Sequence, residues 1–275
     1  MNLQTNQLFS LAGKTAVVTG GTGVLGQAMV KGLSAAGASV VILGRRKDAA
    51  EDIARELRAA GGKALGVGAD VLQRDQLDAA YEHVIKEFGT IDILVNAAGG
   101  NMAGAVIAPD KNFFDLDIDA FQQVVDLNLL GTVLPSQVFS KDMAARRKGV
   151  VINIASMSSF RPITRVVGYS AAKAGIDNFT QWLAVEMARK FGEGLRVNAI
   201  SPGFFITEQN RSLLTNPDST YTARGQAAIN QTPFGRFGRP EELIGTLVWL
   251  CSDAAAFVTG VNVPVDGGFN AFCGV

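Results

Sequence analysis

The chain has 275 residues and a formal net charge of zero; 48% of the residues are hydrophobic and 31 are glycine. Its 25 basic and 25 acidic residues are scattered without blocks, so we expect no nucleic-acid partner and no attraction to an anionic membrane. The N-terminal stretch is polar and no apolar run approaches ~18 residues, so we expect no membrane-spanning segment. Only two cysteines and one histidine, His83, occur, so we expect no metal site and a cytoplasmic location.

The first predicted strand, Thr15–Thr19, is a β-branched run that leads into a glycine-rich turn and then a helical pattern to Ala36. Glycines at this place let the backbone approach a pyrophosphate, and the next helix offers unpaired N–H groups to its charge. A strand before the turn and a helix after it favour a dinucleotide site over a plain glycine turn. The residues assigned to this site are Gly20, Gly21, Thr22, Gly23, Val24, Leu25 and Gly26.

The second predicted strand, Ser39–Leu43, is followed by Gly44, Arg45 and Arg46. In a dinucleotide fold this place meets the adenosine ribose, where an acidic residue suits a free 2′-hydroxyl and an arginine suits a 2′-phosphate. No acidic residue is present, which favours NADP(H) over NAD(H). Alternatively, either arginine is a solvated turn residue.

A helix over 48–60 and a strand over 64–67 lead to Asp70 and Val71, which are assigned to the cofactor site. Asp70 either hydrogen-bonds the adenine edge or caps the helix that starts near Arg74.

The fourth predicted strand, Ile91–Val95, ends in Asn96, Ala97 and, two residues on, Gly99. Small residues at the carboxyl end of a parallel strand let a cofactor lie close, so these three are also assigned to the cofactor site. Asn96 is alternatively a structural tie between strands.

An exposed loop is predicted over 101–117, and a helix follows from Phe121 to about Phe139. Asn128 lies in this helix among apolar neighbours, and a buried asparagine needs hydrogen-bond partners. Either a helix kink with bound water or a buried polar network accounts for it. A kink would let a proton pass onward from Lys173.

The fifth predicted strand, Val150–Ile154, leads to Ser156, and a further helix opens at Tyr169 and runs to about Lys190. Residues four apart share one helix face, so Tyr169 and Lys173 are neighbours. A nearby ammonium favours the phenolate that a general base near neutral pH requires, and Ser156 is placed to hydrogen-bond a substrate oxygen. A tyrosine and a lysine at this spacing also occur on ordinary surface helices, so the assignment depends on the surrounding motifs.

The sixth predicted strand, 196–200, delivers Pro202 and Gly203 to the same edge, and a polar insertion near 204–233 is predicted to form a lid with short helices. A helix over 240–251 and a strand over 262–265 complete the pattern. Seven strands with intervening helices predict one α/β domain over 1–275, a doubly wound parallel sheet with helices on both faces.

The stretches TGGTGVLG and NAAG, the serine, Tyr-x-x-x-Lys and Pro-Gly, in this order and spacing, resemble the short-chain dehydrogenase/reductase family over about residues 10–270. The resemblance implies a Rossmann fold, a nicotinamide cofactor and a homotetramer packed through the helices that carry Asn128 and Tyr169. It also implies a catalytic tetrad of Asn128, Ser156, Tyr169 and Lys173, in which Lys173 lowers the tyrosine pKa and holds the nicotinamide ribose. One departure is Val24, which stands where the family pattern has its middle glycine.

Within the family, DLNLLGTVLPSQVFSKDM, NAAGGN, PGFFITEQNRSLL and PVDGGFNAFCGV are similar to the D-mannonate oxidoreductase (fructuronate reductase) branch. This similarity implies reversible hydride transfer at C5 of a hexuronate, between D-fructuronate and D-mannonate. A hexuronate carboxylate suits a bidentate arginine. The candidate substrate residues are Asn101, Ser156, Arg161, Arg165 and Arg211; for Asn101 and the three arginines, a surface or loop-tethering role is the alternative.

Other functions stay open at this point. Phe204, Phe205 and Leu213 keep an apolar ketone open, beside gluconate-type acids and 3-oxoacyl thioesters. A cofactor-binding regulator without catalysis would lose the tetrad, which is complete here. Thr207 is assigned to the nicotinamide carboxamide, or it caps a lid helix at Glu208.

Overall fold

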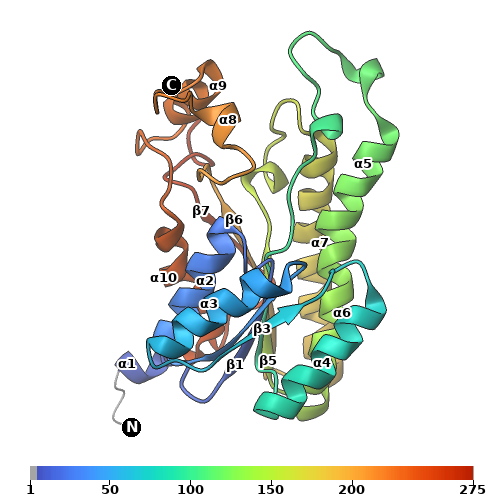
Figure 1. Cartoon of the computed structure of the whole chain (residues 1–275), viewed down its shortest axis with the longest axis vertical. Coiled ribbons are helices and arrows are strands. Elements are labelled where there is room, and N and C mark those ends of the chain that lie inside the picture. Colours follow the sequence, from blue (N-terminus) through green and yellow to red (C-terminus); the bar gives the residue numbers. More distant parts are fainter. Residues whose placement is uncertain (1–4, 275) are drawn as a thin grey trace.

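The computed structural model describes residues 5–274 and contains a seven-stranded sheet in the order β3-β2-β1-β4-β5-β6-β7 (Figure 1). All neighbouring strands are parallel. The strands are β1 Thr15–Thr19, β2 Ser39–Gly44, β3 Ala64–Gly68, β4 Ile93–Asn96, β5 Gly149–Ile154, β6 Leu195–Pro202 and β7 Asn262–Val265. The order reverses between β1 and β4, which is the topological switch point of a Rossmann-type sheet, so the predicted fold class is confirmed.

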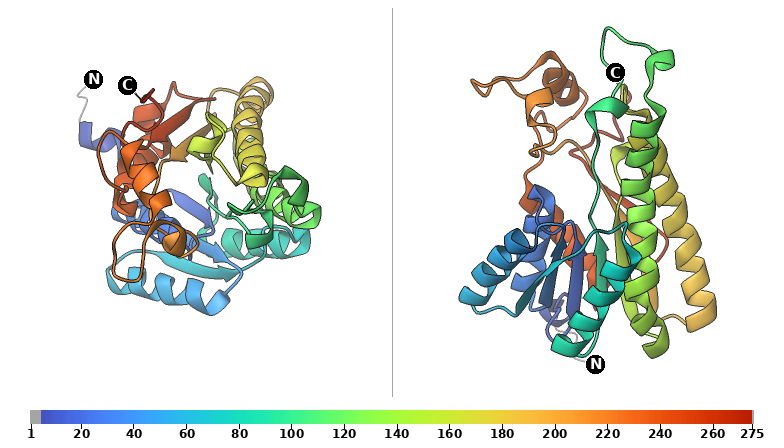
Figure 2. Two further views of the ribbon diagram at one scale, coloured as in Figure 1. Left: turned by 90° about the horizontal axis from the view of Figure 1, so that it is seen from above. Right: turned by 45° about the vertical axis from the view of Figure 1, so that its right-hand side comes forward.

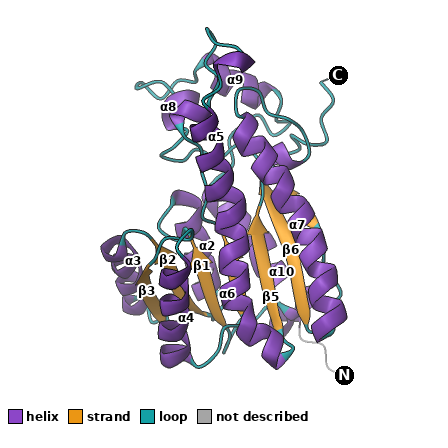
Figure 3. Ribbon diagram, turned by 90° about the vertical axis from the view of Figure 1, so that its right-hand side faces the viewer, coloured by secondary structure: helices purple, strands orange, loops and turns teal. Residues whose placement is uncertain are grey.

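Helices cover both faces of this sheet (Figure 3). One face is covered by α2 Val24–Ala35, α3 Lys47–Ala59 and α10 Ile244–Cys251, and the other by α4 Arg74–Phe88, α6 Gly131–Arg146 and α7 Val167–Phe191. The remaining helices are α1 Thr5–Leu8, α5 Ile118–Val125, α8 Arg211–Leu214 and α9 Ala223–Asn230. No helix within residues 5–274 combines the length and the apolar character that crossing a membrane requires.

The alternation of side chains along each strand explains the two layers of core. Val18 and Ile42 pack with α2 and α3 on one face, whereas Val17 and Leu43 pack with α4 and α6 on the other. All four side chains are fully buried. Continuous β-branched runs buried on both faces are typical of a parallel sheet, which is why the strands could be predicted closely.

The long helix predicted around Asn128 is not regular. α5 ends at Val125, a π-helical turn spans Asp126–Leu130, and α6 begins at Gly131. The predicted helix at Tyr169 starts slightly earlier, at Val167. A π-helical turn inserts an extra residue, and such turns are frequent at functional sites.

The lid segment, defined here as residues 204–233, lies beyond the carboxyl ends of the strands, where α8 and α9 are seen together (Figures 1 and 2). It has a small core of its own, in which Leu214, Ala228 and Ile229 pack with Phe237. The loop 101–117 lies at the same end of the sheet and contains only short turns (Figure 2). The edge that carries the predicted site residues is therefore covered by two separate segments.

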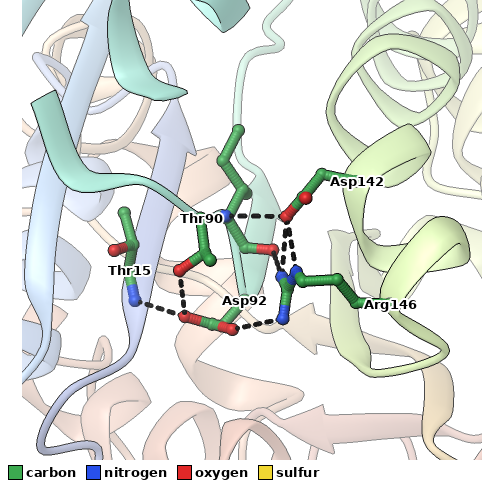
Figure 4. Close-up of polar contacts among 6 residues, drawn as sticks. Thr15, Thr90, Asp92, Asp142 and Arg146 are labelled. Carbon is green, nitrogen blue, oxygen red and sulfur yellow. Dashed lines mark hydrogen bonds and ion pairs between the residues drawn. The ribbon is translucent and has the colours of Figure 1, made fainter. Parts of the chain in front are cut away.

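A charged network ties the chain together at the opposite, amino edge of the sheet (Figure 4). Arg146 on α6 donates to Asp92 at 3.1 Å, to Asp142 at 2.8 Å and to the Ile91 carbonyl at 2.6 Å. Asp92 in turn accepts from the Thr15 N–H at 2.9 Å. These bonds join the starts of β1 and β4 to the end of α6, far from the carboxyl edge.

Candidate active site

A cavity of about 870 Å³ opens at the carboxyl ends of the strands, between the sheet and the lid segment. Its volume is in the range of small-molecule and cofactor sites. The residues predicted from sequence that line it are Gly20, Thr22, Gly23, Val24, Leu25, Gly26, Arg45, Arg46, Asp70, Val71, Ala97, Gly99, Asn101, Ser156, Tyr169, Lys173, Pro202, Gly203 and Thr207.

Two residues assigned to the cofactor lie behind the cavity wall. The Asn96 side chain is buried and donates to Ser136 on α6 and to Asn153 on β5, each at 2.9 Å. It therefore has the alternative role expected for it, a structural tie between strands. A Cβ on Gly21 would lie 2.9 Å from the Ile42 side chain, so this glycine faces the core. Both support the site without lining it.

The glycine turn after β1 is packed too closely for side chains at two positions. Gly20 has a φ of +65°, and a Cβ on Gly26 would lie 2.2 Å from the Gly20 carbonyl oxygen. A Cβ on Gly23 would meet nothing nearer than 3.4 Å. The turn therefore brings the start of α2 against β1 and leaves backbone facing the cavity, although Val24 replaces the glycine of the family pattern.

Polar side chains at the ends of β2 and β3 line the next part of the cavity. Arg45 and Arg46 are exposed, and within residues 5–274 neither belongs to an ion pair. Asp70 accepts from the Leu72 N–H at 3.0 Å, in the turn that precedes α4. Asp70 therefore holds this turn while also lining the cavity.

The Ser156 and Tyr169 hydroxyl groups are in contact at the cavity wall. Ser156 sits just after β5 and accepts from the Ser158 N–H at 3.2 Å, and its side chain also forms a hydrogen bond with that of Tyr169. Burial raises the pKa of the Tyr169 phenol above its ordinary value, and the Ser156 hydrogen bond lowers this pKa in part. At neutral pH the phenol is therefore protonated and can donate.

Lys173 lies one turn beyond Tyr169 on α7, with its Nζ atom 5.5 Å from the centre of the tyrosine ring. The side chain is 4% exposed, and Nζ donates to the Ile154 carbonyl at 2.7 Å. Burial lowers the pKa of Lys173 to about 7. The expectation that Lys173 depresses the tyrosine pKa is therefore not met in this structure, because desolvation raises the pKa of the phenol and weakens the ammonium at the same time.

The Asn128 side chain lies behind the loop that follows β4. It accepts from the Gly100 N–H at 3.2 Å and donates to the Gly100 carbonyl at 2.7 Å. A Cβ on Gly99 would lie 2.7 Å from the Asn128 side-chain oxygen and 3.4 Å from Lys173 Nζ. Asn128 is thus part of a buried polar network next to Lys173, and it does not itself line the cavity.

The three arginines predicted to bind a substrate carboxylate do not line the cavity. Arg161 donates to the carbonyls of Asn270 and Phe272, which tethers the C-terminal stretch. The Arg165 carbonyl accepts from the Ile107 N–H at 3.0 Å, which joins two loops. Arg211 is exposed at the start of α8. The structure thus brings together Asn101 and Ser156 from the predicted substrate set, and not these arginines.

Sequence reasoning missed four polar residues of the lid segment that line the cavity: Glu208, Gln209, Asn210 and Arg224. A Cβ on Gly100 would lie 2.5 Å from the Gln209 amide, so Gln209 packs on the loop after β4. Asn210 accepts from the Thr207 N–H at 2.7 Å and precedes α8, so the lid helix starts at Arg211 and not at Glu208 as expected. No periodic pattern marks these positions, and only their place in a lid signals them.

A sequence profile of the short chain dehydrogenase family matches residues 14–218. The chain belongs to this family. The family resemblance inferred from its motifs is therefore confirmed, and this short-chain dehydrogenase is an NAD(P)-dependent oxidoreductase that acts on CH–OH groups. The glycine turn and the open carboxyl edge fit a dinucleotide, because a backbone-lined turn at the start of a helix is suited to a pyrophosphate.

Known relatives cover the short-chain dehydrogenase almost completely. It is 48% identical over 275 residues to the uncharacterized oxidoreductase UxuB of Bacillus subtilis, and the aligned region covers 97% of this chain and 98% of that protein. A crystal structure of a Haemophilus influenzae protein with bound NAD, provisionally named a D-mannonate oxidoreductase, has a TM-score of 0.91 at 40% identity, covering 99% of this chain and 100% of that one. A gluconate 5-dehydrogenase from Burkholderia cenocepacia, solved with NADP and tartrate, has a TM-score of 0.89 at 32% identity, with 98% and 100% covered.

Proposed function

We propose that this enzyme transfers a hydride reversibly between a nicotinamide cofactor and a sugar acid, interconverting D-fructuronate and D-mannonate. The observation that carries the proposal is the contact between the Ser156 and Tyr169 hydroxyls in the wall of a large cavity with a polar rim. Asn101 supplies part of that rim from the sheet side, and Gln209 and Asn210 supply it from the lid segment. A polyhydroxylated substrate needs such fixed hydrogen-bonding groups.

The side chains take distinct roles in the reducing direction. Tyr169 gives its proton to the substrate oxygen as negative charge develops there, and the Ser156 hydroxyl hydrogen-bonds the same oxygen. Lys173 lies one helical turn from the phenol and next to Gly99, where it would hold the ribose of a bound nicotinamide cofactor. The nicotinamide, when bound, supplies or accepts the hydride.

The substrate is assigned from the stretches that resemble the D-mannonate oxidoreductase branch and from the similar Haemophilus influenzae protein of that provisional name. Two of these stretches lie at the cavity: NAAGGN ends at Asn101, and PGFFITEQNRSLL runs from the end of β6 into the first part of the lid segment. Similarity in the segments that surround a substrate carries more weight for specificity than similarity in the sheet.

For the cofactor we propose NADP(H) over NAD(H). Arg45 and Arg46 stand at the carboxyl end of β2, line the cavity and, within residues 5–274, have no acidic partner in an ion pair. Free guanidinium groups at this place suit a 2′-phosphate. The two similar structures contain NAD in one case and NADP in the other.

A second candidate substrate is a gluconate-type acid. The cavity has the same polar rim for either sugar acid, and the similar Burkholderia cenocepacia enzyme is a gluconate 5-dehydrogenase. An apolar ketone is the weaker alternative; Ile163, Val166 and Leu213 line part of the cavity and are the side chains that would accommodate it.

For the assembly we propose a homotetramer packed through α5 and α7. Large hydrophobic side chains are exposed there: Ile118 at 67%, Trp182 at 59% and Val185 at 56%. Apolar groups gathered on neighbouring helices mark a surface for another protein chain. Light scattering should give four times the mass of the 28.9 kDa chain; a monomer mass would contradict this assembly.

The function is tested by a panel of D-fructuronate, D-mannonate, 5-keto-D-gluconate, D-gluconate, a 3-oxoacyl thioester and an apolar ketone, each with NAD(H) and NADP(H). Absorbance of the reduced nicotinamide reports turnover. We expect the highest kcat/KM with D-fructuronate and NADPH. A higher kcat/KM for 5-keto-D-gluconate would transfer the assignment to the gluconate-type acids, and turnover of the neutral ketone alone would contradict a sugar-acid substrate.

A further inference from the structure

Arg224 is a cation in the cavity wall that neither the family motifs nor the tetrad explain. It is the second residue of α9, it is half-buried, and it lines the same cavity as Ser156 and Tyr169. Its Nη2 atom donates to the Thr164 carbonyl at 3.2 Å. Thr164 belongs to the loop between Ser156 and Tyr169, so the guanidinium lies against the segment that carries the reacting groups.

The charge of Arg224 is not neutralised by a carboxylate of the described chain. Within residues 5–274 no ion pair includes Arg224, and its side chain donates one hydrogen bond there, to the Thr164 carbonyl. Burial lowers the pKa of Arg224, and the nearby positive charge of Arg165 lowers it further. A guanidinium has five N–H donors, so most of them are left for a ligand.

Local packing holds Arg224 in this position. The Thr222 hydroxyl accepts from the Gly225 N–H at 3.0 Å and donates to the Leu213 carbonyl at 2.6 Å, which fixes the start of α9. A Cβ on Gly225 would lie 2.0 Å from the Leu214 carbonyl oxygen, so α9 is pressed against α8. The guanidinium is therefore presented from a packed turn of helix rather than from a free loop.

The other charged groups of the cavity lie elsewhere or have other partners. Arg45 and Arg46 stand at the end of β2, on the adenosine side, and Lys173 donates to the Ile154 carbonyl. Glu208 in the same lid segment is exposed and carries the opposite charge, so it cannot attract an anion. An anionic substrate group next to Tyr169 thus meets Arg224 as the cation with open donors.

We propose that Arg224 binds the carboxylate of the substrate and thereby restricts the enzyme to hydroxy and oxo acids, with the reacting carbon held at Ser156 and Tyr169. This inference rests on the proposed function and adds the residue that selects the acid. Arg–carboxylate pairs are often bidentate and fix orientation as well as affinity. In this arrangement Arg224 is a specificity-determining residue and takes no part in proton transfer.

The test combines substrate kinetics with ligand binding to the NADPH-loaded enzyme. We expect Arg224→Gln to raise KM for the sugar acid about 10- to 100-fold with kcat changed only a few-fold, and Arg224→Lys to lie between Gln and wild type. Arg211→Gln is the matched control, since it removes an arginine from the same lid segment whose side chain does not line the cavity. We expect its KM to equal that of the wild type.

Binding separates this inference from the proposed function. Calorimetry with D-mannonate, D-gluconate and D-mannonamide should show carboxylates binding the wild type at least about tenfold more tightly than the neutral amide, and Arg224→Gln should abolish the difference. If carboxylates bind in this way while no sugar acid is turned over, the proposed function fails and Arg224 keeps its role. If sugar acids are turned over, and Arg224→Gln and Arg224→Lys both retain the wild-type KM and the wild-type preference for carboxylate, the role of Arg224 is overturned.

Folding of each variant is checked by thermal unfolding. Should Arg224→Gln not fold, Arg224→Lys decides, because it keeps the charge but loses the fork. The proposal would then be overturned if two results were found together. The lysine variant would keep the KM and the carboxylate preference of the wild type, and the wild type would bind D-mannonate and its amide equally tightly.

Discussion

The Asn128 side chain and the Gly100 backbone form a reciprocal pair, in which Gly100 N–H donates to Asn128 Oδ1 at 3.2 Å and Asn128 Nδ2 donates back to Gly100 C=O at 2.7 Å. Asn128 Nδ2 also donates to the Val124 carbonyl at 2.8 Å, within the helix that becomes π-helical at this point. The side chain takes a backbone acceptor one turn back, and the irregular turn accommodates this bond. Asn128 thereby couples α5 and α6 to the loop that faces the cofactor cavity.

Asn128→Ala should destabilise the protein by about 1–3 kcal/mol, because it removes two part-buried hydrogen bonds to the Gly100 backbone and a buried one to the Val124 carbonyl. It should also lower kcat, since the loop at Gly99 loses its support next to Lys173. Chemical denaturation and steady-state kinetics measure the two effects. Asn230→Ala, which removes an exposed amide on α9, should change stability by less than about 0.5 kcal/mol. Equal stability of the two variants would contradict this structural role.

The strands were the most predictable part of the fold. Val17, Val18, Val41 and Ile42 are buried on both faces of a parallel sheet, so the β-branched runs themselves mark the strands, and glycines mark their ends. The tetrad itself stays a prediction, but the order of its residues along the chain explains why Ser156, Tyr169 and Lys173 were expected together at the carboxyl edge, where all three line the cavity.

The irregular turn at Asn128 and the roles of the lid residues were not predictable in the same way. The π-helical turn contains Asn128, whose side chain bonds to Gly100, 28 residues away in the sequence. From the sequence alone, Arg161 and Arg224 are both arginines in polar segments, and nothing in the pattern distinguishes their roles. Only packing distinguishes them, because Arg161 is occupied by the C-terminal carbonyls while Arg224 is presented to the cavity by the first turn of α9.

The buried Lys173 should give the protein a characteristic dependence of stability on pH. Its pKa is about 7 in the folded chain against an ordinary value of 10.5, so the unfolded chain binds one more proton between these values. The free energy of unfolding therefore rises with pH in this window, by about 1.4 kcal/mol per pH unit from this group alone. Urea denaturation of wild type and Lys173→Met at pH 7.5, 8.5 and 9.5 should show the wild type gaining stability relative to the variant. A constant difference across this range would mean that the lysine is not held neutral.

The network around Arg146 predicts a variant that is less stable but fully competent to bind the cofactor. Arg146→Met removes bonds to Asp92, Asp142 and the Ile91 carbonyl. Because the three charged side chains are only 16–29% exposed, the variant should lose about 1–2 kcal/mol of unfolding free energy. Arg74→Met breaks the exposed pair with Asp78 and should cost less than about 0.5 kcal/mol. Thermal unfolding compares the two variants. Because the network lies at the amino edge of the sheet, NADPH affinity should be the same in both, and a weakened affinity in Arg146→Met alone would show that the network reaches the site.

In the proposed mechanism the Tyr169 phenol transfers the proton to and from the substrate oxygen. The most direct measurement is the single-turnover rate of Tyr169→Phe with saturating NADPH and D-fructuronate, alongside the dissociation constant of NADPH from its fluorescence. We expect a rate about 10²- to 10⁴-fold below wild type with cofactor affinity unchanged within about twofold, since only the hydroxyl is lost. A rate within a few-fold of wild type would contradict it.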